Sequence, residues 1–122
     1  MNLTKGLPLE DGRVLRLIHV DELKVDMMYQ RGLVDSSVER IVRDFDPMAL
    51  SAIEVGHRKN DGKFYIVDGQ NRHAAVQRRR ELGQTAPTYM LCLVHLSTTQ
   101  RQEARLFVKR GTVRPQIGRA HV

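Results

Sequence analysis

The residues best suited to chemistry in this 122-residue sequence form one short block, Asp-Gly-Gln-Asn-Arg-His, at positions 68–73. The block follows an apolar run typical of a strand and opens a segment of helix-forming composition. A glycine at such a turn gives an anion access to the unpaired N–H groups and partial positive charge of a helix N-terminus. Arg72 adds a planar fork of donors that suits phosphate. The block therefore predicts a phosphate cradle made of Gly69, Gln70, Asn71, Arg72 and His73.

Each of these assignments has a simpler alternative. In a plain strand-to-helix turn, Gly69 would serve geometry and Arg72 would make a surface ion pair, and short glycine motifs recur by chance. Asp68 is a candidate catalytic residue, because a carboxylate before a phosphate-binding turn can hold Mg²⁺ or act as a general base toward a hydroxyl. Alternatively, Asp68 accepts backbone N–H bonds as a turn or N-cap residue.

The elements that position this block alternate between strands and helices. Apolar, β-branched runs predict the strands, and Asn60-Asp61-Gly62 predicts a hairpin turn. Helical spacing of apolar residues and capping patterns predict the helices. The expected strands are 13–20, 52–58, 63–67 and 88–96, and the expected helices are 35–46, 71–82 and 97–110. These elements predict a small mixed α/β (α+β) domain, a mixed sheet with packed helices.

The same patterns carry finer expectations. Ser36 with Glu39 and Ser97 with Gln100 have the spacing of capping boxes. The nearly continuous apolar run at 88–96 indicates a strand buried on both faces. The inward face of the last helix is expected to carry three residues, Ala104, Phe107 and Val108.

The composition excludes several classes of protein. With 41% hydrophobic and 28% charged residues and no low-complexity tract, the chain is expected to be one soluble globular domain. It has neither the ~20 apolar residues of a membrane span nor a secretory signal, so we expect a cytoplasmic protein with no membrane partner. The single cysteine, Cys92, is expected to be a buried structural thiol, and the five histidines lack zinc-site spacing. No metal ligands are predicted.

The net charge of +6 is concentrated toward the C-terminus, where residues 101–122 carry six basic side chains and one acidic one. This polarity fits an anionic partner, either a nucleotide phosphate or a nucleic-acid backbone. A basic stripe of Arg78, Arg79 and Arg80 on the second helix is predicted to contact DNA phosphates. The alternative is a solvated helix face.

From about residue 14 to 116, the sequence resembles the ParB/sulfiredoxin superfamily, especially the ParB-like (ParB-like nuclease) domains of phages and mobile elements. Three blocks match in order: Tyr29-Gln30-Arg31 with the helix that follows, Asp68 to Ala75, and Glu103 to Arg114. Gly69 and Arg72 fall on the first and last residues of the G-E-R-R block of ParB. The resemblance implies a ParB/sulfiredoxin-like fold. It further implies binding of a nucleoside triphosphate, CTP or ATP, with Mg²⁺, in a DNA-associated protein of the plasmid-partition or phage-regulatory type.

The resemblance also implies further site residues and some exclusions. Tyr29, Gln30 and Arg31 would line the nucleotide cleft, and Arg114 would be retained from the third block, E-N-x-x-R. Gln70 stands where sulfiredoxin has its catalytic cysteine, so sulfiredoxin chemistry is excluded. An amide cannot act as a carboxylate base, so hydrolysis by the route of ParB is not implied either.

Two other functions and one question of chain ends stay open. Related members of the superfamily are described as nucleases or phosphorylate small substrates, so a Mg²⁺-dependent nuclease, NTPase or small-molecule kinase using Asp68 is an alternative. A degenerate interaction module that binds no nucleotide is another. Residues 117–122 match the translation of a widely used sequencing adapter, so we expect a domain at 1–116 and an artefact tail at 117–122. A missing C-terminal region would then supply DNA recognition or a homodimer contact.

Overall fold

The computed structural model describes residues 2–30 and 32–113. In these residues a six-stranded mixed sheet has the strand order β1-β2-β6-β4-β5-β3. The strands are β1 (Leu7–Pro8), β2 (Val14–His19), β3 (Leu23–Lys24), β4 (Ile53–Arg58), β5 (Phe64–Asp68) and β6 (Tyr89–Thr98). The helices are α1 (Asp35–Arg43), α2 (Gln70–Glu81) and α3 (Gln100–Val113), with 3-10 turns η1 (Val20–Glu22) and η2 (Pro47–Ala49). The predicted mixed α/β class is confirmed. The predicted boundary at residue 116 and the tail at 117–122 lie outside the described residues.

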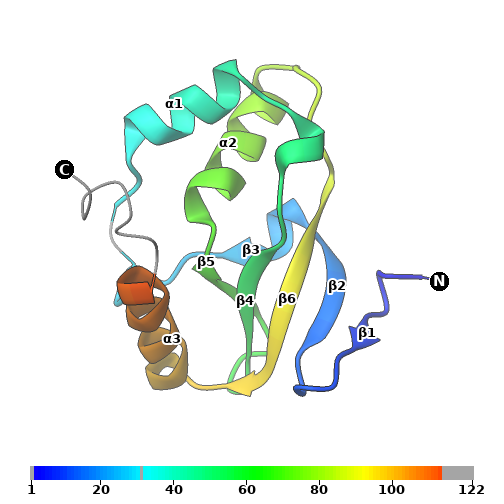
Figure 1. The fold of residues 1–122 in the computed structure, drawn as a ribbon, viewed down its shortest axis with the longest axis vertical. Coiled ribbons are helices and arrows are strands. Elements are labelled where there is room, and N and C mark those ends of the chain that lie inside the picture. The colour runs from blue at the N-terminus through cyan, green and yellow to red at the C-terminus, as the bar shows by residue number, and fades with distance from the viewer. Residues whose placement is uncertain (1, 31, 114–122) are drawn as a thin grey trace.

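The six strands pair in both parallel and antiparallel directions within one sheet. Strand β4 runs antiparallel to β5 and parallel to β6, while β2 is antiparallel to β6 and β3 is parallel to β5. The predicted hairpin turn joins β4 to β5, with Gly62 at a φ of +69°. Helices α1 and α2 lie together at one end of the molecule, and α3 lies apart from them (Figure 1). Only Gly69 separates the C-terminal end of β5 from the first residue of α2.

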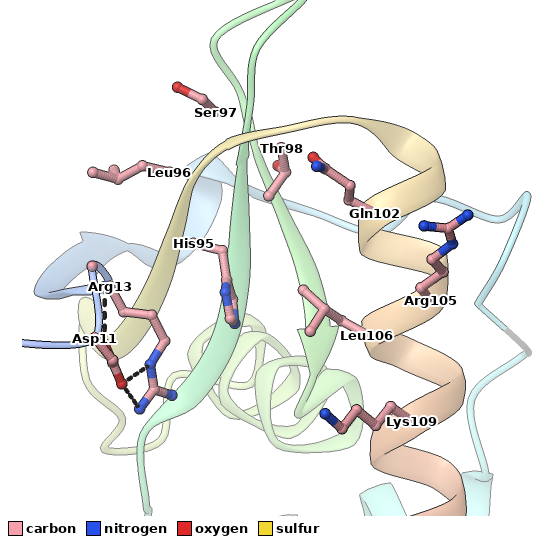
Figure 2. A pocket seen from close by; sticks show the side chains of 11 residues that line it. Asp11, Arg13, His95, Leu96, Ser97, Thr98, Gln102, Arg105, Leu106 and Lys109 are labelled. Carbon is pink, nitrogen blue, oxygen red and sulfur yellow. Dashed lines mark hydrogen bonds and ion pairs between the residues drawn. The ribbon is translucent and has the colours of Figure 1, made fainter.

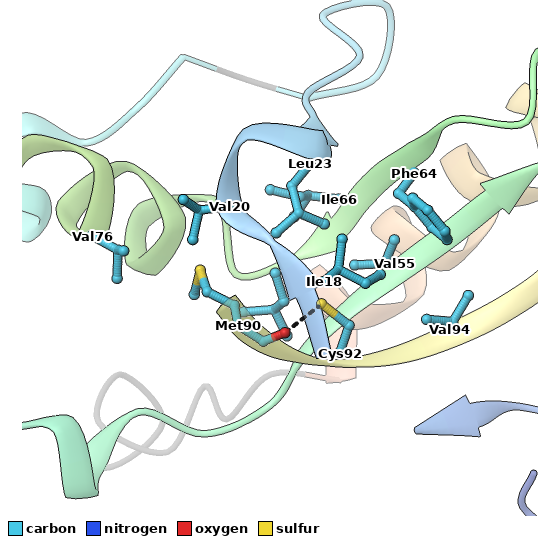
Figure 3. Close-up of a cluster of buried hydrophobic side chains, with 11 residues drawn as sticks. Ile18, Val20, Leu23, Val55, Phe64, Ile66, Val76, Met90, Cys92 and Val94 are labelled. Carbon is cyan, nitrogen blue, oxygen red and sulfur yellow. Dashed lines mark hydrogen bonds between the residues drawn. The ribbon is translucent and has the colours of Figure 1, made fainter. Parts of the chain in front are cut away.

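The hydrophobic core lies on one face of the curved sheet and is closed by α2 (Figure 3). Ile53, Val55 and Ile66 from β4 and β5 are fully buried, and α2 contributes Val76. Burying such side chains removes apolar surface from water, the main stabilising term in folding. The core is thus built from the two strands that lead to the 68–73 block.

Strand β6 is buried on one face only, so the prediction of a strand buried on both faces is wrong. Met90, Cys92 and Val94 are buried, whereas Leu91 and Leu93 between them are only half-buried. The reason is that α3 packs on β5 and leaves the second face of β6 partly open.

Cys92 is confirmed as a buried thiol. Its Sγ lies 3.4 Å from the Met90 carbonyl, and burial raises the pKa of the thiol to about 12. The thiolate, which is the reactive form, is therefore strongly disfavoured.

The helix starts differ from the predicted capping boxes. Helix α1 has Val34 as N-cap and no side-chain cap, so the Ser36–Glu39 box is wrong. Helix α3 does have a capping box, but Thr99 and Gln102 form it, with reciprocal bonds of 2.9 and 3.2 Å. The box lies two residues beyond the predicted one because β6 continues through 98.

The inward face of α3 also differs from the prediction. Val108, predicted to face inward, is 60% exposed, whereas Ala104 and Phe107 are half-buried. Among the residues of α3 whose burial is described, Glu103 is the fully buried one. A carboxylate at this position needs partners inside the protein, and these are described below.

Candidate functional site

A cleft of about 500 Å³ lies at the start of α2. Its walls come from the loop before α1, from α1 itself, from the β5–α2 turn and from α3. Six of the residues predicted from the sequence line it: Gln30, Asp68, Gly69, Gln70, Asn71 and Arg72. Ser37, Arg40 and Phe107 line it as well; they lie within the first and third matching blocks but were not predicted as site residues. The fold thus brings the second sequence block together with Gln30 from the first.

Gly69 makes the turn that opens α2. It has a φ of +112°, a left-handed conformation that side chains disfavour. A Cβ on Gly69 would lie 2.4 Å from Cγ2 of the buried Ile53 and 3.0 Å from Nη2 of Arg72. No side chain caps α2, whose first N–H groups have no partner within the helix itself. This geometry requires glycine and leaves the helix start approachable from the cleft.

Arg72 is held at the edge of the cleft. Its Nη1 donates to Ser51 Oγ and, at 3.4 Å, to the Ser51 carbonyl. Its Nη2 lies 4.0 Å from Asp68 Oδ2, at the outer limit of an ion pair. Burial lowers the pKa of the guanidinium, which nevertheless stays charged at neutral pH. Arg72 therefore presents a fixed positive charge beside the positive end of the helix.

Gln30 contributes an acceptor to the cleft. The side chain is 5% exposed, and its Nε2 donates to the carbonyls of Ile66 at 2.6 Å and Val67 at 3.4 Å. Because the nitrogen donates to β5, Oε1 is the acceptor atom of the amide that remains for another partner. Asn71 has a different task, since its Oδ1 accepts a bond of 3.4 Å from the Val34 N–H and ties α2 to the loop before α1.

A buried carboxylate network fixes the wall that carries Gln30. Glu103 accepts from Arg58 at 2.5 and 3.2 Å, from Thr98 Oγ1 at 2.8 Å and from the Tyr29 hydroxyl at 3.0 Å. Arg58 also donates to Asp26 at 2.7 Å. Hydrogen bonding to Glu103 raises the pKa of Arg58, so its guanidinium stays charged. The network joins α3, β4 and the 26–30 loop.

A second carboxylate, Glu54, anchors the other end of α3. Arg110 binds it with both Nε and Nη2, the latter at 2.7 Å, and His95 Nε2 binds it as well. Burial alone would raise the pKa of Glu54, but the hydrogen bonds from Arg110 and His95 outweigh it and lower the pKa to about 2. Sequence analysis missed both networks, because their members are far apart in the chain.

Two residues predicted for the nucleotide site lie elsewhere. The Tyr29 hydroxyl is turned toward Glu103 and the Ile66 carbonyl, and burial raises its pKa well above the usual value. His73 is 4% exposed and its Nε2 donates to the Val20 carbonyl at 2.8 Å, on the side of α2 away from the cleft. We therefore leave both out of the proposed site. Arg31 and Arg114 lie outside the described residues, and their roles stay predictions.

His73 predicts a pH effect on stability. Burial lowers its pKa, so the folded state holds the ring neutral. The contribution of the neutral His73 ring to the free energy of unfolding is fully present above the unfolded-state pKa of about 6.5. It is lost as the pH falls from there toward the lowered pKa of the folded state, by up to about 1.4 kcal/mol per pH unit. Urea unfolding at about pH 7.5 and 5.5 should show a larger loss for wild type than for His73→Gln. Equal losses in the two proteins would contradict this role.

The three arginines predicted for DNA do not form one stripe. Arg78 lies 3.8 Å from Glu39, and Arg80 lies 3.5 Å from Asp21. Arg79 donates at 2.8 Å to the carbonyls of Val42 and Thr85, and it stacks over the Phe45 ring. It is therefore a contact between α1 and α2, and each of the three cations has a partner within the chain.

Comparison with known proteins places the chain in a family. A family model described as a family of unknown function, DUF6551, matches residues 25–118. The chain belongs to DUF6551. The matched DUF6551 region contains the cleft, both carboxylate networks and all of α3. No match is found among curated proteins.

The DUF6551 domain has a ParB/sulfiredoxin-like fold, as the resemblance implied. It is similar to the C-terminally truncated chromosome-partitioning protein ParB from Caulobacter crescentus complexed with CTP-gamma-S, with a TM-score of 0.67, 16% identity and coverage of 84% of this chain and 55% of that one. For the same protein complexed to the centromeric parS site, the TM-score is 0.59 and the identity is 17%, with coverage of 84% of this chain and 49% of that one. For sulfiredoxin from Arabidopsis thaliana, the TM-score is 0.50 and the identity is 18%, with coverage of 77% of this chain and 96% of that one. The chain spans about half the length of these ParB chains, and the likeness concerns the fold.

Within residues 2–30 and 32–113, no three His, Cys, Asp or Glu side chains gather in a way that could hold a metal ion. In the same part of the DUF6551 chain, no helix has the length and apolar character to cross a membrane.

Proposed function

We propose that this DUF6551 domain binds the phosphates of a nucleoside triphosphate, such as CTP or ATP, in the cleft at the start of α2. The observation that carries the proposal is the convergence of the Gly69 turn, the uncapped helix start and the fixed Arg72 guanidinium on one cleft. Backbone N–H groups, a helix dipole and arginine together are the usual means of binding a polyphosphate. Arg40 adds a second positive side chain from α1.

The size of the cleft supports a ligand of this class. A volume of about 500 Å³ lies in the range of small-molecule sites, about 300–1,000 Å³. Beyond the phosphate end, Gln30 offers an acceptor and Phe107 an aromatic ring, which suit the donor edge and the face of a base. The ParB structure that holds CTP-gamma-S supports the same ligand class.

Mg²⁺ fits the cleft only together with the nucleotide. Asp68 is the one carboxylate that lines it. Mg²⁺ is commonly bound by one or two carboxylates with substrate phosphates and waters, so Asp68 would supply the protein ligand. Bound there, the ion would neutralise phosphate charge. Asp68 and the nucleotide would hold it jointly.

The proposal includes association with DNA, as in a protein of the partition or phage-regulatory type. The chain has a net charge of +6, and the second ParB structure contains parS DNA. The surface that would meet DNA is argued in the next subsection.

Replacing Arg72 with alanine should weaken nucleotide binding by about 1.5–3 kcal/mol, the value of a hydrogen bond to a charged group. Isothermal titration with CTP, ATP and GTP, each with and without Mg²⁺, measures the change. Arg78→Ala is the matched control, because it removes the same side chain from the same helix outside the cleft. Unchanged affinity in Arg72→Ala would remove Arg72 from the site. Absence of binding by any of the three nucleotides to wild type would overturn the proposed function.

A further inference from the structure

Helix α3 carries a row of positive side chains on its exposed face. Arg101, Arg105 and Lys109 are spaced four residues apart and all three are exposed. Residues at this spacing lie above one another on one side of a helix. At 1.5 Å per residue the row, which we call the α3 stripe, is about 12 Å long.

The two arginines of the α3 stripe have no acidic partner among the described residues. Arg101 and Arg105 make no hydrogen bond or ion pair with any described residue through their side chains. Glu103 is the only acidic residue of α3, and it is fully buried against Arg58. Arg110 differs from the stripe, because it turns inward to Glu54. Glu103 and Glu54 thus pair with Arg58 and Arg110 inside the protein and not with Arg101 or Arg105.

The contrast with α2 is direct. Arg78 and Arg80 have Glu39 and Asp21 as neighbours, and Arg79 is bound to backbone carbonyls. Their positive charge is largely compensated or used for packing. Arg101 and Arg105 therefore differ from these three arginines, because no described residue forms an ion pair with them.

A groove of about 460 Å³ runs beside the stripe (Figure 2). Arg105 and Lys109 project from α3 on one side, and the 11–13 loop forms the other side. There Arg13 is ion-paired with Asp11 at 2.7 Å. The other two lysine or arginine side chains that line the groove, Arg105 and Lys109, both lie on the α3 side, so an extended anion would follow the helix.

We propose that the α3 stripe contacts the phosphate backbone of duplex DNA. This assignment deepens the DNA association proposed above and requires no nucleotide in the cleft. Each strand of a duplex carries one phosphate per about 3.4 Å of helix axis, so a row of about 12 Å laid along the axis spans three to four phosphates of one strand. Such contacts position a protein without reading sequence.

A single strand fits the stripe less well. Proteins that bind single strands combine positive charge with aromatic side chains on which bases stack. The only aromatic residue of α3 is Phe107, and its ring packs on Tyr29 with centroids 5.7 Å apart. The exposed face of α3 therefore offers charge and no stacking platform.

The test measures binding of the whole chain to a short fluorescein-labelled duplex by anisotropy, at salt concentrations from about 50 to about 200 mM. The variant Arg101→Gln/Arg105→Gln/Lys109→Gln should bind roughly tenfold more weakly or worse at low salt, and its slope of log K against log salt should be shallower by about 3. The charge-matched variant Arg43→Gln/Arg78→Gln/Arg80→Gln should retain the wild-type affinity. Melting curves verify that both variants are folded.

The outcomes separate the stripe from the wider proposal. If wild type binds the duplex and the α3 variant binds equally well, the stripe is not the DNA surface, although the DNA association stands. Loss of binding only in the α1/α2 variant would move the surface to α2. If wild type shows no binding to the duplex at low salt, both the stripe and the DNA association are overturned. Equal binding of a single strand of the same length would refute the assignment to duplex DNA.

Discussion

Replacing Glu103 with alanine should lower the free energy of unfolding by about 3–5 kcal/mol, the cost of removing one partner from a buried ion pair. Glu103 is completely buried and bonds Arg58, Thr98 and Tyr29. It also packs directly over Gly56, where a Cβ would lie 2.8 Å from the Glu103 Cγ. The substitution would leave the Arg58 guanidinium, whose side chain is 11% exposed, with Asp26 as its remaining ion-pair partner.

Chemical denaturation measures this loss, and Glu39→Ala is the matched control. Glu39 is an exposed helical glutamate 3.8 Å from Arg78, so its removal should cost no more than about 1 kcal/mol. If Glu103→Ala does not fold, Glu103→Gln preserves the shape and should still be clearly less stable than wild type. A double substitution with Arg58→Ala should cost less than the sum of the two single ones. A cost for Glu103→Ala as small as that of Glu39→Ala would disprove the network.

Replacing Gly69 with alanine should destabilise the fold by about 2–4 kcal/mol and abolish detectable nucleotide binding. Two costs add here. Gly69 has a φ of +112°, and its Cβ would lie 2.4 Å from the buried Ile53 Cγ2. Since Ile53 is held in the core, the start of α2 must move, and with it the N–H groups that face the cleft.

Gly83→Ala separates these two costs. Gly83 also has a positive φ, +71°, but a Cβ there would meet nothing within 4 Å. This variant should therefore lose only about 1 kcal/mol and bind nucleotide like wild type. Thermal unfolding and titration calorimetry on the three proteins measure both effects. Similar losses in the Gly69 and Gly83 variants would show that the contact with Ile53 does not control the cleft.

The features that could be predicted from the sequence are local ones. The hairpin at Asn60-Asp61-Gly62 and the turn at Gly69 depend on backbone preferences of neighbouring residues, so a short window contains the information. The strand-turn-helix order that places Arg72 in the first turn of α2 follows from the same windows. These local signals located most of one wall of the cleft.

The features that were missed depend on tertiary contacts. Burial of Glu103 is decided by Arg58, which lies 45 residues away, and no periodicity within α3 reveals such a partner. Ser51 fixes Arg72 from a loop 21 residues earlier. The inward turn of the Tyr29 hydroxyl has the same origin, because its partner is again Glu103. A sequence pattern identifies which residues are able to do chemistry, while packing decides which of them face the cleft.

Backbone proton–nitrogen correlation spectra recorded during a titration with CTP and Mg²⁺ test the central claim most directly. We predict that the largest shifts occur at the amides of Gly69 to Arg72 and at Nε–H of Arg72, with smaller ones at Gln30 and Ser37. Amides along the α3 stripe should hardly move. Saturating shifts confined to α3, or no shifts at the start of α2 at any concentration of CTP, ATP or GTP, would contradict the account.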